Sequence, residues 1–366
     1  MRFPRNSADF LPVAVAGLLF PLSATAQENW AFQPMVADLD TPWAIAPMPG
    51  GGLLVTEKDG RLLMFRDGAR TEVAGVPDVE TSGQGGLLDV TLARDFDTTR
   101  TLFLTYAKDQ NGGSGTALAS ARLSEDGQRL EDVRDLFEMK PGSSGGRHFG
   151  SRVVEAADGT LFVTIGERGD RPAAQDLGRH NGTVVRVNRD GSVPQDNPFV
   201  GQEGALPEIW SYGHRNPQGA GLDLDGNLWV SEHGAQGGDE VNRVRKGANY
   251  GWPVISYGRH YSGGKIGEGT SKPGMEQPEY YWDPSIAPSG LMVYSGALDE
   301  DLRGDIFVGA LKFDYIARLS GDPLEEVAQI KGPETSRVRD IVEGPEGGIW
   351  FISVGEGTVY RMMPDG

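Results

Sequence analysis

The chain has 366 residues, of which 53 are glycine, 23 are proline and none is cysteine, and its formal net charge is −18. The negative charge argues against binding to nucleic acid, because a phosphate polymer needs a basic surface. The lack of cysteine excludes zinc–thiolate sites, iron–sulfur clusters and cysteine nucleophiles. Glycine and proline destabilise helices and are favoured in turns, so the composition predicts many short strands joined by turns.

The first 26 residues have the pattern of a secretory signal peptide. Arg2 and Arg5 make the start positive, an apolar run extends over 10–22, and Ala-Thr-Ala at 24–26 has the small-x-small form of a cleavage site. The apolar run is too short to span a bilayer comfortably, and no later segment is apolar enough to do so. We therefore expect a periplasmic or secreted protein without a membrane span, whose mature chain covers 27–366.

One pattern recurs six times along the mature chain: an apolar strand, a glycine-rich or Asp-Gly turn, and a second strand with alternating apolar residues. Asp-Gly between two such strands is a strong hairpin signal, because a type I′ turn needs positive φ. The expected strand pairs are 43–48 with 53–57, 87–92 with 101–106, 151–156 with 160–166, 221–224 with 227–232, 291–294 with 305–311, and 340–343 with 349–354.

These repeats predict an all-β fold, a single six-bladed β-propeller with four-stranded antiparallel blades. A strand around 30–36 would complete the blade that holds the C-terminal strand 357–362, which leaves few exposed sheet edges. A β-sandwich pair and a β-helix are the alternatives, and such long and uneven repeats disfavour both. The largest gaps between repeats, 168–209 and 233–286, are the expected places for functional loops.

A histidine and a glutamate flank the third strand pair. His148 lies in the glycine-rich segment 145–150, just before the first strand, and Glu167 follows the second. A propeller hairpin can bring the Glu167 carboxylate back to the His148 imidazole. Such a pair is a suitable general base near neutral pH. The alternative is a histidine on a surface loop without a catalytic role. The residues alone favour neither interpretation over the other.

Four cationic residues lie near the expected ends of strands. Arg215 stands in a second glycine-rich segment, 213–219, which also contains His214 and Asn216, and Lys312, Arg337 and Arg339 follow later in the chain. Residues two apart on an extended chain share a face. If the cations converge, they form a pocket for a polyanionic small molecule. Ordinary exposed surface charge is the alternative for any one of them.

The segment 232–240 is acidic and rich in glycine, and 249–253 (Asn-Tyr-Gly-Trp-Pro) follows it. Calcium takes carboxylate and backbone carbonyl oxygens in flexible geometry, and these segments supply both. The acidic spacing is not that of an EF-hand loop. Taken alone, the segment favours an ordinary loop with a capped turn.

The order and spacing of 84–88, 213–219 and 232–242 with 249–253 resemble the soluble pyrroloquinoline quinone (PQQ)-dependent sugar dehydrogenases, the glucose/sorbosone dehydrogenase family. The resemblance extends over nearly all of the mature chain, 39–361. It implies a six-bladed propeller with PQQ and calcium at the top of the central channel.

The resemblance also implies roles for individual residues. His148 would take the proton of the sugar C1 hydroxyl, and Glu167 would orient it. The PQQ carboxylates and quinone oxygens would contact Arg215, Asn216, Lys312, Arg337 and Arg339, with Gln84 nearby. Arg215 and His148 would thus serve both the cofactor and the reaction. The carbonyls of Gly234 and Ala235 would ligate the calcium that touches PQQ, and Glu240 with the Tyr250 carbonyl would hold a second, structural calcium.

These roles imply a quinoprotein that oxidises the C1 hydroxyl of an aldose to a lactone, transfers hydride to PQQ and passes the electrons to an external acceptor. A calcium-dependent propeller hydrolase such as a lactonase is one alternative. It would need carboxylates that converge on a central metal, where this chain offers arginine, lysine and backbone groups. A non-catalytic propeller that binds a partner protein is another, and it leaves His148 and the cations unexplained.

Overall fold

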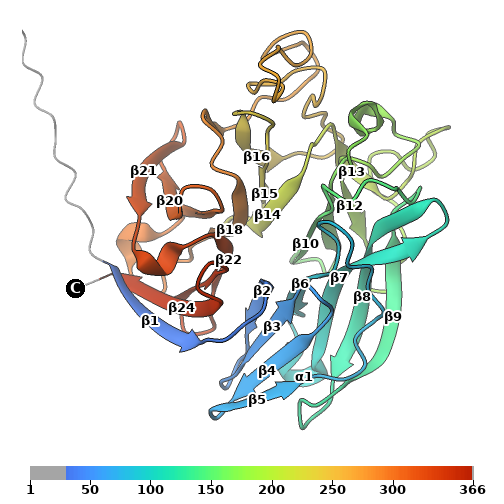
Figure 1. The fold of residues 1–366 in the computed structure, drawn as a ribbon. Coiled ribbons are helices and arrows are strands. Elements are labelled where there is room, and N and C mark those ends of the chain that lie inside the picture. The colour runs from blue at the N-terminus through green and yellow to red at the C-terminus, as the bar shows by residue number, and fades with distance from the viewer. Residues whose placement is uncertain (1–29, 365–366) are drawn as a thin grey trace, which may run out of the picture.

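Strands make up nearly all the regular structure of the chain. The structure is a computed structural model that describes residues 30–364, so the predicted signal peptide at 1–26 lies outside the described residues. Within this range, 24 strands form six four-stranded sheets whose neighbouring strands are antiparallel. Figure 1 shows the sheets arranged around a central axis. The prediction of an all-β, six-bladed propeller is confirmed.

In blades 1 to 5 the four strands follow one another along the chain, and the first of them lies nearest the axis. In blade 6 the first of the three C-terminal strands takes this inner place. Blade 1 contains β2 (Pro42–Pro47), β3 (Leu53–Glu57), β4 (Leu62–Arg66) and β5 (Ala69–Glu72). Blade 2 contains β6 (Leu87–Leu92), β7 (Thr101–Gln110), β8 (Gly113–Leu123) and β9 (Leu130–Glu138). Blade 3 contains β10 (Gly150–Glu155), β11 (Leu161–Ile165), β12 (Thr183–Val187) and β13 (Ile209–Tyr212).

The second half of the chain repeats this order. Blade 4 contains β14 (Pro217–Leu222), β15 (Leu228–Glu232), β16 (Asp239–Val244) and β17 (Tyr280–Trp282). Blade 5 contains β18 (Pro288–Val293), β19 (Ile306–Ala310), β20 (Tyr315–Ser320) and β21 (Glu325–Ile330). Blade 6 contains β22 (Val338–Glu343), β23 (Ile349–Ser353), β24 (Thr358–Pro364) and the N-terminal β1 (Trp30–Val36).

The ring closes through blade 6, as the sequence predicted. β1 pairs with β24 in antiparallel register, with Trp30 opposite Pro364. Because the outermost strand of this blade comes from the other end of the described chain, the first and last blades cannot separate without breaking a strand pair. The closure therefore holds the inner strands in fixed positions around the axis.

The turn residues behave as their chemistry dictates. The Asp-Gly turns place Gly60, Gly159 and Gly226 at positive φ, between 81° and 108°, where glycine carries no steric cost. Two inner strands begin at least three residues earlier than predicted, and that of blade 5 starts at Pro288, not at residue 291. The inner strand of blade 4 begins at Pro217, not at residue 221, because burial between neighbouring blades makes a strand of a sequence that has little apolar alternation. The second glycine-rich segment therefore runs directly into an inner strand.

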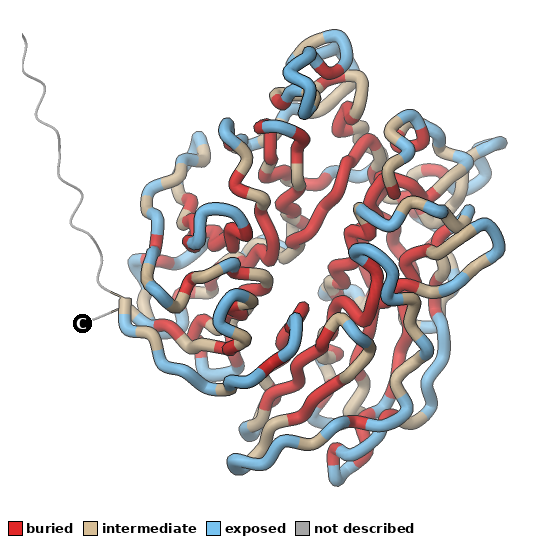
Figure 2. Tube along the Cα trace, in the orientation of Figure 1, coloured by how far each residue is buried: buried red, intermediate tan, exposed pale blue. Residues whose placement is uncertain are grey.

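The hydrophobic core lies between the blades, where buried side chains of adjacent sheets pack together. Figure 2 shows that buried residues are concentrated in the strands. Leu54 of blade 1 and Leu104 of blade 2, for example, belong to one buried cluster. Burying a leucine side chain contributes about 1.5–3 kcal/mol. The two long gaps in the repeat pattern contain outer strands of blades 3 and 4 as well as the loops expected there.

A buried ion network ties the inner strands together across the axis. The guanidinium of Arg152, on β10, lies 2.9 Å from Asp89 of β6 and 2.8 Å from Asp340 of β22. The same guanidinium stands over the Trp43 ring of β2 at 4.4 Å. The side chains of all three charged residues are at most 6% exposed. Four inner strands are thus joined by one cation at the centre of the ring.

The helices are short. The described residues contain α1 (Phe96–Thr99) and the 3₁₀ turns η1 (Arg171–Gln175), η2 (Glu300–Leu302) and η3 (Pro333–Thr335). Across residues 30–364, no helix has the length and apolar character needed to cross a membrane.

Candidate active site

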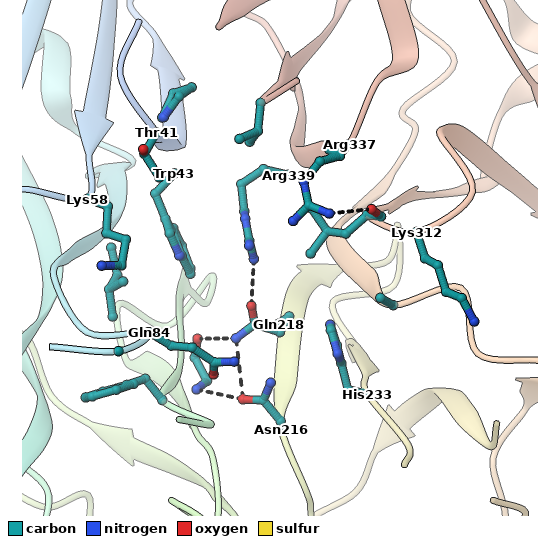
Figure 3. Close-up of a pocket in the computed structure, with 18 of the residues that line it drawn as sticks. Thr41, Trp43, Lys58, Gln84, Asn216, Gln218, His233, Lys312, Arg337 and Arg339 are labelled. Carbon is teal, nitrogen blue, oxygen red and sulfur yellow. Dashed lines mark hydrogen bonds between the residues drawn. The ribbon is translucent and has the colours of Figure 1, made fainter. Parts of the chain in front are cut away.

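A cavity of about 690 Å³ lies at the end of the axis where the inner strands begin. Its lining comes from the starts of these strands, the segments just before them and the turns that follow the second strands, and Figure 3 shows the labelled side chains around it. Five residues predicted to bind the cofactor line it: Gln84, Asn216, Lys312, Arg337 and Arg339. The other two, His148 and Arg215, are the chain neighbours of the lining residues Phe149 and Asn216.

His148 and Glu167 are in direct contact. The Nδ1 atom of His148 is hydrogen-bonded to Oε1 of Glu167, and that oxygen also accepts the Gly169 N–H at 2.9 Å. The backbone N–H of His148 donates to Oε1 of Gln84 at 2.7 Å, and its φ of 57° is unusual for a non-glycine residue. Glu167 therefore holds the imidazole and Gln84 holds the His148 backbone, at the rim of the cavity next to the start of β10.

The surroundings keep the His148 ring neutral. Burial lowers the pKa of His148 below its ordinary value, the hydrogen bond to Glu167 opposes this, and the nearby charge of Arg215 lowers it further. Because the Glu167 carboxylate accepts a hydrogen bond, Nδ1 carries the ring proton. The Nε2 atom is then a free acceptor, which is the form that a general base needs.

The other histidine in a glycine-rich segment is in a different position. His214 is fully buried and stacks on Tyr250, with ring centroids 4.6 Å apart. Its Nδ1 lies 2.9 Å from Oε1 of Glu232, and its Nε2 lies 2.9 Å from the Ser211 hydroxyl. Both ring nitrogens have partners inside the protein, so His214 has a structural role and no free atom for a substrate.

Two arginines in or beside the cavity are held by neutral partners. Nη1 of Arg339 donates to Oε1 of Gln218 at 2.8 Å, as Figure 3 shows. Burial, with the charges of Arg152 and Arg337, lowers the pKa of Arg339 to about 10. Nη1 of Arg215 donates to the carbonyl of His233 at 3.2 Å, and burial lowers its pKa as well. Arg215 is buried and Arg339 half-buried. Cations that are shielded from water and have only neutral hydrogen-bond partners attract an anionic ligand.

The remaining predicted cations differ from each other. Nη1 of Arg337 donates to the Leu311 carbonyl at 3.1 Å, and its backbone N–H donates to Asp314 at 2.9 Å, which fixes it at the cavity wall. The Lys312 ammonium lies over the Phe313 ring at 4.8 Å. In Figure 3 it extends away from Arg339. The arginines thus face the cavity together, whereas the Lys312 nitrogen points to one side.

Amide side chains connect the inner strands beneath these cations. Oδ1 of Asn216 accepts the Gly150 N–H at 3.2 Å and lies 3.4 Å from Nε2 of Gln218. Nε2 of Gln218 also donates to the Gly150 carbonyl at 3.1 Å. Sequence reasoning missed Gln218, although it stands inside the second glycine-rich segment. It orients Arg339 and joins β14 to β10.

Sequence reasoning also missed His233, which lines the cavity. Burial lowers its pKa to about 3, and the charges of Arg215 and Arg339 contribute. Its ring is hydrogen-bonded to the Pro288 carbonyl, while its Nε2 is buried without a partner. His233 is therefore a neutral imidazole. His233 was missed because it stands within the acidic segment 232–240, whose composition indicated only a possible calcium-binding loop.

The residues predicted to bind calcium fall into two groups. Gly234 and Ala235 form a tight turn in which the Gly234 N–H donates to Asp239 at 2.7 Å. A side chain at Gly234 would lie 2.2 Å from the Gly238 carbonyl oxygen and 2.3 Å from that of Gly237, so only glycine allows these carbonyls to crowd together. This turn directly follows His233 at the cavity.

The second group surrounds Glu232. The Asn242 amide donates to the carboxylates of Glu232 and Glu240 at 3.0 and 3.1 Å, and its own Oδ1 is buried without a partner. Burial raises the pKa of Glu240 to about 8, and the Glu232 charge adds to this. The Tyr250 hydroxyl is occupied by Arg243 and Arg245, so only its carbonyl could be a ligand.

Side-chain ligands alone do not make a metal centre in the described part of the chain. No group of three or more histidine, cysteine, aspartate or glutamate side chains there could hold a metal ion. A cation would depend on backbone carbonyls, the Asn242 amide oxygen and one or two carboxylates. This is the mixed oxygen set that calcium accepts.

The fold and the cavity define a class of protein: a six-bladed propeller with an arginine-lined cavity on its axis and a histidine–carboxylate pair at the rim. Residues 39–361 match the family described as Glucose / Sorbosone dehydrogenase, and the chain belongs to this family of oxidoreductases. The family resemblance predicted from the sequence is confirmed.

Individual relatives agree with this assignment. The chain is 41% identical to aldose sugar dehydrogenase YliI of Escherichia coli (strain K12) over 362 residues, which covers 94% of this chain and 98% of the relative. A crystal structure of the soluble aldose sugar dehydrogenase from E. coli in its apo form superposes with a TM-score of 0.89, at 39% identity, over 92% of this chain and all of that one. The PQQ-bound form of aldose sugar dehydrogenase from Streptomyces coelicolor superposes with a TM-score of 0.74, at 25% identity, over 92% and 99% of the two chains.

Proposed function

We propose that this protein oxidises the C1 hydroxyl of aldose sugars to the lactone, with PQQ as hydride acceptor, calcium as the accompanying metal and an external acceptor for the electrons. One observation carries the proposal: the His148–Glu167 pair stands beside a cavity that Arg337 and Arg339 line. Membership of the glucose/sorbosone dehydrogenase family and a PQQ-bound relative support it.

The residues around the cavity fit PQQ, which carries three carboxylates and two quinone carbonyls. Arg337 and Arg339 would bind carboxylates, because a guanidinium matches the planar geometry of a carboxylate. Near them, Nε of Arg215 and Nε2 of His233 are buried without partners. When bound, PQQ would supply the two-electron redox couple that protein side chains lack. Asn216 and Gln84 would position it by hydrogen bonds.

His148 would move the proton of the reaction. Oxidation of the C1 hydroxyl requires its proton to leave, and the free Nε2 of His148 is the base that would take it. Glu167 would keep the proton on Nδ1 and stabilise the imidazolium that forms, while Gly169 and Gln84 hold the pair in place. Such a positioned base contributes about 10²–10⁴-fold to the rate.

Calcium would be held by oxygen atoms that this chain leaves available. The carbonyls of Gly234 and Ala235, next to His233, would form one site near the cavity. Glu240 and the Tyr250 carbonyl would form the other, where the unpartnered Oδ1 of Asn242 offers a further ligand. At the first site, calcium would supply Lewis-acid polarisation. At the second, it would neutralise the carboxylates of Glu232, which is buried, and Glu240, which is half-buried.

A reconstitution experiment tests the function. Protein stripped by exhaustive dialysis against EDTA is mixed with calcium, PQQ or both, and then with an aldose and a redox dye. Dye reduction is expected only when both are present, and NMR of the product should show the lactone. Activity that survives removal of PQQ and calcium would contradict the proposal, as would turnover of a lactone without dye reduction.

We also propose that the enzyme acts after export, because residues 1–26 have the composition of a signal peptide. Mass spectrometry of the protein recovered from the periplasm or medium of the source cells should find a chain that begins near residue 27. Recovery of the intact chain in the cytoplasm alone would contradict this.

A further inference from the structure

A second cavity, of about 670 Å³, lies between blades 4 and 5 beside the first. We call it the aromatic groove, because six aromatic side chains line it: Tyr257, Tyr280, Tyr281, Trp282, Phe313 and Tyr315. Three come from β17, one from β20, and Phe313 from the hairpin between β19 and β20. Asp283, Gln329 and Lys331 add polar groups to the lining. None of these residues is used in the site described above.

The aromatic groove shares a wall with the reaction cavity. Lys312 and Asp314 line the cavity, whereas Phe313, between them, lines the groove. The same alternation holds on the facing segment, where Ala287 lines the cavity and Ile286 the groove. The two segments are joined by backbone hydrogen bonds from Leu311 to Ala287 and from Lys312 to Ile286, at 3.0 and 3.1 Å. Only this wall, one residue thick, therefore separates the groove from the cavity.

The aromatic rings of the groove are arranged before any ligand binds. Tyr257 stacks on Tyr281 with centroids 4.0 Å apart, and Tyr280 meets Trp282 edge-on at 5.0 Å. Tyr281 is nevertheless 44% exposed and Phe313 42% exposed. The Tyr281 ring is thus fixed by stacking and open to solvent, and Phe313 adds exposed apolar area beside it, which a ligand could cover.

The chemistry of the lining selects a class of ligand. Aromatic faces complement the C–H faces of a pyranose ring, and the tyrosine hydroxyls, the Asp283 carboxylate and the Gln329 amide can bond its hydroxyls. Binding sites of this kind combine aromatic walls with a few placed polar groups. A flat apolar ligand would leave these polar groups without partners, which costs binding energy. A sugar therefore fits the whole lining, and an aromatic molecule fits only part of it.

We propose that the aromatic groove binds saccharide rings, and that it holds the units of an oligosaccharide beyond the reducing-end ring that enters the reaction cavity. The groove would make the enzyme act on oligosaccharides as well as on free aldoses. The direction of the chain, with its reducing end at His148, depends on the proposed function. Saccharide binding to the groove itself does not.

The first experiment measures binding without the cofactor. Apo-protein is titrated with maltotriose and with cellotriose, and the heat of binding and tryptophan fluorescence are recorded. Tyr281→Ala and Phe313→Ala should each weaken trisaccharide binding about tenfold, since each removes a stacking face. Phe313→Tyr should retain it. Leu224→Ala is the matched control, because Leu224 is 47% exposed and follows the far end of β14 from the cavity.

The second experiment uses the holoenzyme. In Tyr281→Ala and Phe313→Ala, the KM for maltotriose should rise about tenfold while the kcat/KM for glucose stays within twofold of wild type. Apo-protein that binds no trisaccharide, or folded variants that bind it like wild type, would overturn the proposal. Variants that raise the KM for a quinone or dye acceptor instead would overturn it as well and assign the groove to the electron acceptor. Binding to apo-protein combined with an inactive holoenzyme would overturn the proposed function and leave the groove as a saccharide site.

Discussion

The Nδ1 atom of His148 is bonded to Oε1 of Glu167, and the two residues stand 19 positions apart on opposite sides of a single hairpin. β10 leaves from His148 and β11 returns to Glu167, so the antiparallel pairing of Gly150 with Ile165 fixes the distance between them. The base and its partner are thus set by the innermost hairpin of blade 3, at the end where the cavity opens.

The pH dependence of the reaction should follow His148. Burial lowers its pKa below the ordinary value of about 6.5, so the base stays neutral and active until the pH falls below that value. The rate of cofactor reduction should therefore be flat near neutrality and decline only on the acid side. Glu167→Gln removes a group that raises this pKa, so the acid limb should move to lower pH. Stopped-flow rates from pH 4 to 8 check this, and an acid limb that moves to higher pH in the variant would contradict it.

Removal of the Arg339 guanidinium should weaken PQQ binding. Arg339 is half-buried and its protein partner is the neutral Gln218, so its charge is available to a carboxylate. Arg339→Ala should cost about 2–5 kcal/mol of binding free energy, as expected for a buried charged hydrogen bond. Arg303→Ala, at a half-exposed arginine outside the cavity, is the control. Equal PQQ affinity of the two variants in a fluorescence titration would mean that Arg339 does not meet the cofactor.

Arg152 should be important for stability. Arg152→Ala leaves Asp89 and Asp340 buried without their cation, which should lower the free energy of unfolding by about 3–5 kcal/mol. Burial already raises the pKa of Asp89 to about 6, and loss of the arginine raises it further. A group with a raised folded-state pKa contributes stability at low pH that is lost as the pH rises through that pKa. The free energy of unfolding of the variant should therefore be closest to that of wild type at pH 5 and furthest below it at pH 8.

Urea unfolding at the two pH values measures this difference. Arg122→Ala removes an exposed arginine from blade 2 and should change stability by less than about 1 kcal/mol at either pH. A pH-independent loss in Arg152→Ala would show that the carboxylates gain other partners.

Calcium should stabilise the apo-protein through Glu240. A ligand that binds only the folded state adds about 2.7 kcal/mol at one hundred times its dissociation constant. Wild-type protein should thus melt at a lower temperature after EDTA treatment and recover with calcium. Glu240→Gln should lose most of this response because it removes a charged ligand. An unchanged calcium response in the variant would place the stabilising ion elsewhere.

The fold could be predicted from the sequence because its signals are local. Each Asp-Gly turn and each pair of alternating strands lies within a short stretch of the chain, and six such repeats favour a closed ring of blades over a sandwich or a β-helix. The geometry of the cavity is not local. Gln218, which orients Arg339, is 121 residues away from it, and the two meet only because both begin inner strands. His233 and the sideways direction of Lys312 were missed for the same reason, since the packing of other blades determines them.

The most direct test of the account is the rate at which sugar reduces bound PQQ in His148→Gln. Glutamine keeps the size of the side chain and can still bond Glu167, but it cannot accept a proton. The variant should bind PQQ and calcium like wild type and reduce PQQ about 10²–10⁴-fold more slowly in stopped-flow absorbance. A variant that reduces PQQ at the wild-type rate would contradict the assignment of His148 as the base.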